Sequence, residues 1–383
     1  MAISIISNPK KYSPAHWSVE WQLAMDDLGT LPERIDFGYY LAEEGGTRLM
    51  EDKKFKPFAE GDTFSKQFQS ITKGLVYTVF PAELATAQTD ANYVKRVKLK
   101  YGEVNYNFDT CDSVKDLSSE TGVINLVNAN VNSQTHSVFG DSAGFTSPRT
   151  GLLLHERPSR WNLLHGSKDY VWFLGTGQIV LSYWNGSSQL GSNQIFNLTG
   201  ANTAKYICLD YSLYSITDPP THMNLFYSDG VVETTIRADY CSCQEQDKYM
   251  GILFLEPRGG RSMLSTRKPL TIDIERTGTE IYKPFDKTQT QHKTGGNSII
   301  IPKGSRKLTF ETEFDFETGV QRWLENFCAS PGFHAQRGYG ASTVWEKFIL
   351  DPNTIRINEV NKILKFSFSG YISENIHGQT EDI

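Results

Sequence analysis

SRKLTFETEFDF, residues Ser305–Phe316, alternates strictly between apolar and polar side chains from its fourth residue onward, if Thr312 is counted with the apolar set. Because successive side chains of a strand point to opposite faces of a sheet, the pattern predicts a β-strand with one face in a core. Lys362–Ile372, KILKFSFSGYI, repeats it, and Ser265–Gly278, STRKPLTIDIERTG, opens like SRKLTFETE, as two similar strands of one sheet would. The expected inward residues of the first stretch are Leu308, Phe310, Thr312, Phe314 and Phe316.

The same alternation recurs near the N-terminus, in His16–Met25 and in Tyr93–Tyr101. In the second stretch, YVKRVKLKY, three basic residues fall on one face and Val97, Leu99 and Tyr101 on the other. We interpret the basic face as the wet face of a strand, where lysines guard sheet edges, rather than as a nucleic-acid groove. The 22 Phe, 18 Tyr and 7 Trp suit half-buried pleated surfaces, and 31 Gly with 15 Pro supply turns. The predicted fold is mainly β, with two or three β-sandwich or barrel modules.

A chain of 383 residues is too long for one ordinary core. We predict an N-terminal β domain over 1–132, a loop or linker over 133–149, a middle β domain over 150–258 and a C-terminal β domain over 259–383. In the middle domain, Gly175–Gly177 separates two apolar runs and predicts a hairpin, and Asn185–Gly186 predicts a second turn. The segments 132–148 and 185–203 are rich in Ser, Gly and Asn, and we expect them to be loops that contact neighbouring proteins.

One helix is predicted inside the C-terminal domain, at about 318–329, from the sequence GVQRWLENFCASPG. Thr318 and Gln321 fit a capping box, and Ser330–Gly332 ends the helix. The apolar stripe predicts a helix that packs on the terminal sheet and braces it. Its polar face leaves Arg322 and Glu325 for a neighbouring subunit. The stripe is formed by Val320, Trp323, Leu324, Phe327 and Cys328.

Charge and composition exclude several classes of function. The formal net charge is −6, so no general attraction to nucleic acid is expected. No apolar run is long enough to span a membrane as a helix. Five dispersed cysteines do not form a disulfide framework, which favours synthesis in a reducing compartment.

Two short motifs resemble catalytic or metal sites, and we favour a structural explanation for each. Phe139–Phe145, FGDSAGF, resembles the sequence around a serine-protease nucleophile at Ser142, but its surroundings are typical of a loop and no matching histidine context is present. Cys241 and Cys243 form a close pair without the second pair of ligands that structural zinc needs. No nucleotide-binding fingerprint is present, and EPRGGR at Glu256–Arg261 lacks the pattern. We therefore predict no catalytic residue, no metal and no cofactor.

Several segments together resemble tail and baseplate structural proteins of tailed phages and prophages of Bacteroidetes hosts. They are IISNPKKYSPAHWSVEWQL at Ile5–Leu23, the run Cys241–Gly278, WLENFCASPGFH at Trp323–His334, and KILKFSFSGYI at Lys362–Ile372. The chain departs from the family's pattern at Phe254–Glu256, where an aromatic-Leu-Asn is expected, and at Phe333, which replaces an aliphatic residue.

The resemblance implies a non-enzymatic virion protein of hub, distal-tail or baseplate-ring type, assembled in the cytoplasm of the bacterial host. Its expected partners are further copies of itself, in a ring, and other tail proteins; contact with the host surface is also expected. The alternative is a receptor- or glycan-binding tail appendage, for which an aromatic platform is the candidate site. A cell-wall or glycan hydrolase is the third hypothesis, without motif support. The platform residues are Trp161, Trp172, Tyr183 and Trp184, of which Trp161 and Trp184 are also interface candidates.

Overall fold

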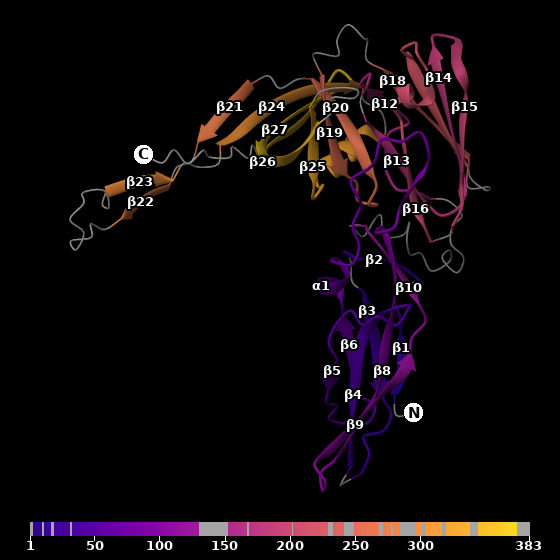
Figure 1. Ribbon diagram of the computed structural model, residues 1–383, viewed down its shortest axis with the longest axis vertical. Coiled ribbons are helices and arrows are strands. Elements are labelled where there is room, and N and C mark those ends of the chain that lie inside the picture. Colours follow the sequence, from indigo (N-terminus) through magenta and orange to yellow (C-terminus); the bar gives the residue numbers. More distant parts are fainter. Residues whose placement is uncertain are drawn as a thin grey trace, which may run out of the picture.

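The computed structural model confirms a mainly β chain that is built from several sheets and short helices (Figure 1). An elongated N-terminal part extends away from a broader body, in which the middle and C-terminal parts lie side by side. The described residues are 3–9, 11–16, 19–30, 33–129, 152–166, 168–200, 202–228, 233–240, 249–267, 271–276, 279–283, 296–300, 304–315, 319–337 and 344–373.

The N-terminal part is a sandwich of two sheets. One sheet has the order β1 (Ile3–Ser7), β3 (Glu20–Met25), β6 (Thr63–Gln67). The other has the order β2 (Tyr12–Pro14), β10 (Ile124–Val127), β8 (Val94–Asn107), β4 (Glu33–Glu43), β5 (Lys53–Phe55), with β9 (Asp112–Glu120) also on β8 and the short helix α1 (Gln69–Thr72) alongside. Trp21, Leu23, Phe37 and Leu41 pack between the two sheets in one core.

Strand β8 has the two faces that its sequence predicts. Val97, Leu99 and Tyr101 are buried. On the other face, Lys98 and Lys100 form ion pairs with Glu120 of β9, at 2.6 and 3.6 Å. β8 is an interior strand rather than an edge, so carboxylates of neighbouring strands neutralise its charges.

The middle part is also a sandwich. One sheet has the order β11 (Leu152–Leu153), β13 (Tyr170–Leu174), β16 (Ala204–Cys208), β7 (Gln88–Asp90). The other has the order β12 (Arg160–Leu163), β18 (Glu233–Tyr240), β17 (His222–Ser228), β14 (Gly177–Asn185), β15 (Ser188–Leu198), and the 3₁₀-helix η1 (Tyr211–Tyr214) follows β16. β7 comes from the N-terminal third of the sequence, so that part of the chain contributes an edge strand to the middle sandwich.

Two predictions for the middle part are wrong. Gly175–Gly177 does not form a hairpin, because β13 and β14 belong to opposite sheets of the sandwich, and the glycines turn the corner between them. A Cβ on Gly177 would lie 2.6 Å from the Phe173 ring, so this corner requires glycine. The segment 185–203 is not a loop, because β15 pairs with β14 over most of it. Asn185–Gly186 does begin the β14–β15 turn, as expected.

The C-terminal part is a seven-stranded antiparallel sheet with helix α3 (Val320–Cys328). The order is β20 (Arg261–Arg267), β19 (Tyr249–Leu255), β25 (Phe333–Arg337), β26 (Val344–Val360), β27 (Ile363–Ser373), β24 (Gly304–Asp315), β21 (Thr271–Arg276). β22 (Thr279–Lys283) and β23 (Gly296–Ile300) form a separate hairpin. The similar stretches at 265–278 and 305–313 do contribute adjacent strands, β21 and β24. β19 belongs to this sheet, although the predicted boundary at 258 assigned it to the middle domain.

Helix α3 packs its apolar stripe onto this sheet. Val320, Trp323, Leu324 and Phe327 are buried. The Phe327 ring lies 5.1 Å from Phe254 and 5.1 Å from Phe368 between centroids. Gly319, with φ of 115°, is the N-cap and has no side chain to cap the helix; Thr318, the predicted capping residue, lies outside the described residues. Gln321 instead donates to Glu325 one turn later, at 3.0 Å.

Candidate functional site

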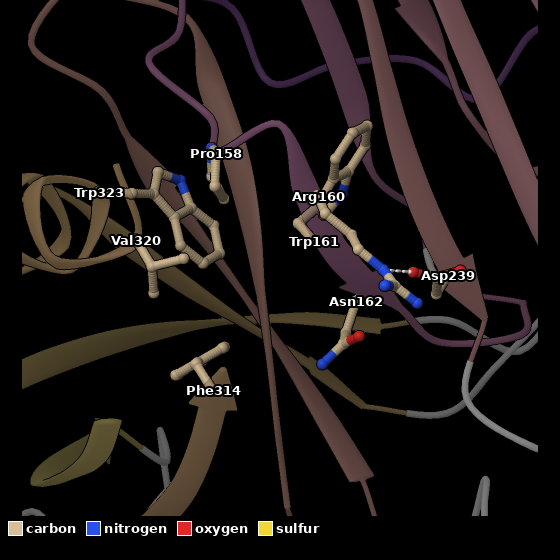
Figure 2. Close-up of a pocket in the computed structure, with 8 residues that line it drawn as sticks. All are labelled: Pro158, Arg160, Trp161, Asn162, Asp239, Phe314, Val320 and Trp323. Carbon is tan, nitrogen blue, oxygen red and sulfur yellow. Dashed lines mark hydrogen bonds and ion pairs between the residues drawn. The ribbon is translucent and has the colours of Figure 1, made fainter. Parts of the chain in front are cut away.

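A small cleft lies where the middle and C-terminal parts meet, and its lining contains residues from both (Figure 2). Val320 and Trp323 of α3, with Phe314 of β24, form an apolar wall. Opposite them, Arg160 of β12 forms an ion pair with Asp239 of β18, at the mouth of the cleft. The cleft has a volume of about 100 Å³. Sites for small organic ligands usually have roughly 300–1,000 Å³, so this cleft is too small for most of them.

Behind the cleft, a buried ion pair joins Arg157 to Asp169. The two side chains are 1% and 0% exposed. The guanidinium donates from both terminal nitrogens to the carboxylate, at 2.7 Å for Nη2 to Oδ1, and Nη2 also donates to the Tyr170 carbonyl at 2.6 Å. Asp169 accepts further bonds from the Trp161 indole at 3.3 Å and from the Met263 backbone at 3.1 Å. Such full satisfaction is what allows an ion pair to be buried without leaving an unpaired charge.

Because Met263 lies on β20, Asp169 ties the C-terminal sheet to the middle sandwich.

A buried carboxyl group, that of Glu256, forms the second connection. It accepts bonds from Ser262 Oγ at 2.6 Å, from the Trp323 indole at 3.1 Å and from the backbone of Glu156 at 3.3 Å. Burial raises the pKa of Glu256, and its hydrogen-bond donors and Arg157 offset part of that rise. Glu256 therefore links β19, helix α3 and the segment before β12 through one side chain.

Glu156 forms a third connection, at the edge of the interface. It pairs with Arg258 at 2.8 Å and with Arg322 of α3 at 2.9 Å, and accepts from Asn326 Nδ2 at 3.2 Å. Arg322, which the sequence predicts at an interface with a neighbouring subunit, forms this contact within the chain, and its side chain remains 54% exposed. Glu325 on the same helix is exposed.

His155 is buried beside this cluster and is 4% exposed. Neither of its ring nitrogens has a hydrogen-bond partner among the described residues. Burial lowers its pKa well below the usual value, and the nearby charges of Arg157 and Arg258 lower it further. The imidazole is therefore neutral at pH 7.

All three parts of the chain meet at the β19–β20 turn. The Gly259 carbonyl accepts from Thr78 Oγ1 of the N-terminal part at 2.7 Å, and the Gly260 backbone donates to the Leu154 carbonyl of the middle part at 3.0 Å. A single apolar cluster surrounds the turn, with members from the N-terminal, middle and C-terminal parts. These include Tyr12, Tyr93, Val127, Trp172, Tyr206, Leu253 and Met263.

Three of the four residues considered for an aromatic platform lie in the core, which is the commoner use of such side chains. Trp161 is 4% exposed, and Trp172 and Tyr183 are 0% exposed, so they are core residues rather than a sugar-stacking surface. Trp184 is half-buried; its indole donates to Ser182 Oγ at 3.1 Å, and its ring stacks on His222. The structure thus excludes Trp161 as a surface anchor and leaves Trp184 partly accessible.

The sequence motifs around Ser142 and at Cys241 and Cys243 lie outside the described residues, as does the loop 132–148. Within the described ranges, no group of three or more His, Cys, Asp or Glu side chains is arranged to hold a metal ion. No helix in that part of the chain is long and apolar enough to cross a membrane.

The sequence reasoning missed the residues that make the junction. Glu256 and Gly259 lie in EPRGGR, which was compared with nucleotide-binding loops and with tail proteins, and neither comparison predicted a junction between modules. Arg157 follows the apolar run 151–154 closely, and Asp169 directly precedes the apolar run 170–174. Charged residues are rarely buried unless they are paired, so charges beside two apolar runs are the one signal in the sequence for this ion pair.

Comparisons with known proteins do not assign a family. No family model matches the chain, and no curated protein matches it. Among solved structures, it is similar to extracellular domains 3–5 of Drosophila OTK, with 9% sequence identity over 81% of this chain and 93% of that one, at a TM-score of 0.26. A TM-score this low does not establish a common fold.

Proposed function

We propose that the chain is a non-enzymatic structural subunit of a phage tail, of hub, distal-tail or baseplate-ring type, that assembles with copies of itself and with other tail proteins. The observation that supports this proposal is the junction. Three β-modules share one apolar cluster, and Asp169, Glu256 and Gly259 connect them through buried polar contacts. Such a junction holds the modules in fixed orientations, as a subunit that transmits force along a tail requires. The resemblance of four sequence segments to tail and baseplate proteins supplies the class of assembly.

On this proposal the protein is made in the bacterial host cytoplasm and ends in the virion. The test is to purify particles from an infected or induced host culture, identify the protein by mass spectrometry and locate it by immunogold electron microscopy. We expect labelling confined to one level of the tail, and defective tails when the gene is deleted. Normal, infectious particles from the deletion strain would refute the proposal.

A second candidate, a glycan-binding appendage, is favoured by a different observation. A surface pocket of about 320 Å³ lies between β15 and the segment after η1. Of its lining residues only Asp218 carries a charge; Ser192, Ser215 and Thr217 have hydroxyl groups, and Gln194 has an amide, of the kind that bind sugars. Binding on an array of host polysaccharides that is lost in Asp218→Ala would support this function. Equal binding by the variant, or none by the wild type, would exclude it.

A further inference from the structure

Strand β15 is the free edge of the five-stranded middle sheet. It pairs with β14 on one side, and no strand in the described part of the chain pairs with its other side. It lies at the outer margin of the middle part (Figure 1). Its outer backbone N–H and C=O groups are therefore available to a further strand.

The composition of β15 is unusual for an exposed edge. From 185 to 203 the sequence has no Lys, Arg, Asp, Glu or Pro, which are residues that commonly protect edges from pairing. Ile195, in the middle of this neutral stretch, is 57% exposed. By contrast, the edge strands β5, β6, β7, β9, β12, β20 and β21 each contain charged residues. β1, β2, β11 and β23 are also neutral, but they have five, three, two and five residues against eleven in β15.

A bulge lies in the middle of β15, at residues 191–193. The register with β14 shifts between Leu181 and Tyr183, opposite Gly191, which has φ of 67°. Beyond that bulge, Gln194–Leu198 pairs regularly with Gly177–Leu181. This regular five-residue segment includes Ile195, so the exposed apolar side chain lies on the part of the edge that is best ordered for pairing.

We propose that β15 pairs with β15 of a second copy of this chain, in antiparallel orientation about a two-fold axis near Ile195. An identical strand suits this edge because self-pairing opposes no like charges and places Asn193 and Asn197, exposed on the same face as Ile195, opposite one another across the interface, where their amides hydrogen-bond. A charged partner strand would gain no complementary charge here. The contact is isologous and yields pairs of subunits, whereas the ring contacts proposed above are heterologous, so this inference goes beyond the proposed function.

The test uses the full-length protein and sedimentation velocity over a concentration series. We expect the wild type to form dimers, and Ile195→Lys and Ile195→Glu each to weaken dimerisation by about tenfold or more, because every substitution faces its own copy. An equimolar mixture of the two variants restores dimers, since opposite charges then meet. Ile349→Lys, at an equally exposed isoleucine on an interior strand, leaves the dimer unchanged.

Several outcomes would overturn the proposal. A wild type that stays monomeric at every concentration would do so, even if the protein is found in virions. Dimerisation that survives Ile195→Lys, or that is lost in Ile6→Lys of β1 instead, would assign the contact to another edge. Failure of the Lys and Glu variants to form a mixed dimer would show that β15 does not face itself. Circular dichroism of each variant confirms that the fold is retained.

Discussion

Replacing Gly259 with alanine is expected to weaken the packing between the three modules and to lower the free energy of unfolding. Gly259 has φ of 85°, in the left-handed region that favours glycine. A Cβ at this position would lie 1.7 Å from the carbonyl oxygen of Asn128 and 2.6 Å from the ring of Tyr93. The closest atom is backbone, which cannot rotate away as a flexible side chain would. The N-terminal module must therefore move relative to the β19–β20 turn.

Two terms set the magnitude. An alanine in the left-handed region costs roughly 1–2 kcal/mol. Inserting a methyl group into a packed site costs a further 1–3 kcal/mol or so through displaced neighbours. The expected loss in free energy of unfolding is therefore about 2–5 kcal/mol, a large share of the roughly 5–15 kcal/mol that stabilises a typical domain.

The assay is urea unfolding followed by tryptophan fluorescence, in parallel with limited proteolysis. Gly186→Ala is the matched control, because Gly186 has φ of 59° but nothing within 4 Å of its Cβ position. It isolates the conformational term. We expect Gly259→Ala to lower the first unfolding transition well beyond the control, and to expose new cleavage sites near Tyr77 and Asn128, on either side of the turn. A loss no larger than that of Gly186→Ala would refute a close-packed junction.

Three further predictions follow from the buried groups. Trp323→Phe keeps an aromatic ring but replaces the larger indole and removes its donor to Glu256, so it should cost about 1–3 kcal/mol in urea unfolding. Trp184→Phe removes the same atoms at a half-buried site, where the indole bonds a half-buried hydroxyl, and should cost less. Burial lowers the pKa of His155 in the folded protein. As the pH falls below the unfolded-state pKa of about 6.5, the unfolded chain therefore binds a proton at His155 more readily than the folded chain, and the free energy of unfolding decreases. Glu256 has a raised pKa and acts in the opposite sense, so the test compares His155→Leu with the wild type. Between about pH 7.5 and 5, the free energy of unfolding of the variant should depend less on pH. Equal slopes for the two proteins would contradict the prediction. Alkylation mapped by peptide mass spectrometry should label exposed Cys111 in the folded protein, and should reach Cys208, buried with a pKa raised to about 12, only after unfolding; rapid labelling of Cys208 in the native state would be inconsistent with the packing.

The periodic signals in the sequence predicted local structure well. The alternation in Tyr93–Tyr101 gave the correct faces of β8, and the stripe in α3 identified the side chains that the C-terminal core buries. These succeed because periodicity reports which face of an element is apolar, and burial follows from that. β15 was not predicted, because an edge strand that faces solvent needs few apolar residues and shows no clear alternation. Its Ser, Gly and Asn residues are also typical of loops.

Pairing between distant segments was not predictable in the same way. Two glycines after β13 indicate a turn, but the turn between sheets of a sandwich and the turn of a hairpin use the same residues. What distinguishes them is that β13 pairs with β16, some 30 residues later in the chain, and no local pattern encodes that choice. The junction is of the same kind, since Asp169 bonds Met263, 94 residues later, and Glu256 bonds Glu156, 100 residues earlier.

The junction also limits where this molecule can recognise others. Asp169, Glu256 and Arg157 are charged or ionisable groups that would bind ligands strongly if exposed, but their hydrogen bonds are used within the chain. Removing any one partner would leave a buried charge or donor uncompensated, so these groups cannot be released for binding without loss of stability. Groups that can change partners without that penalty lie on the surface, and the backbone of an edge strand exchanges water for a partner strand at little cost. On the proposed function, assembly through sheet edges would leave the fold intact.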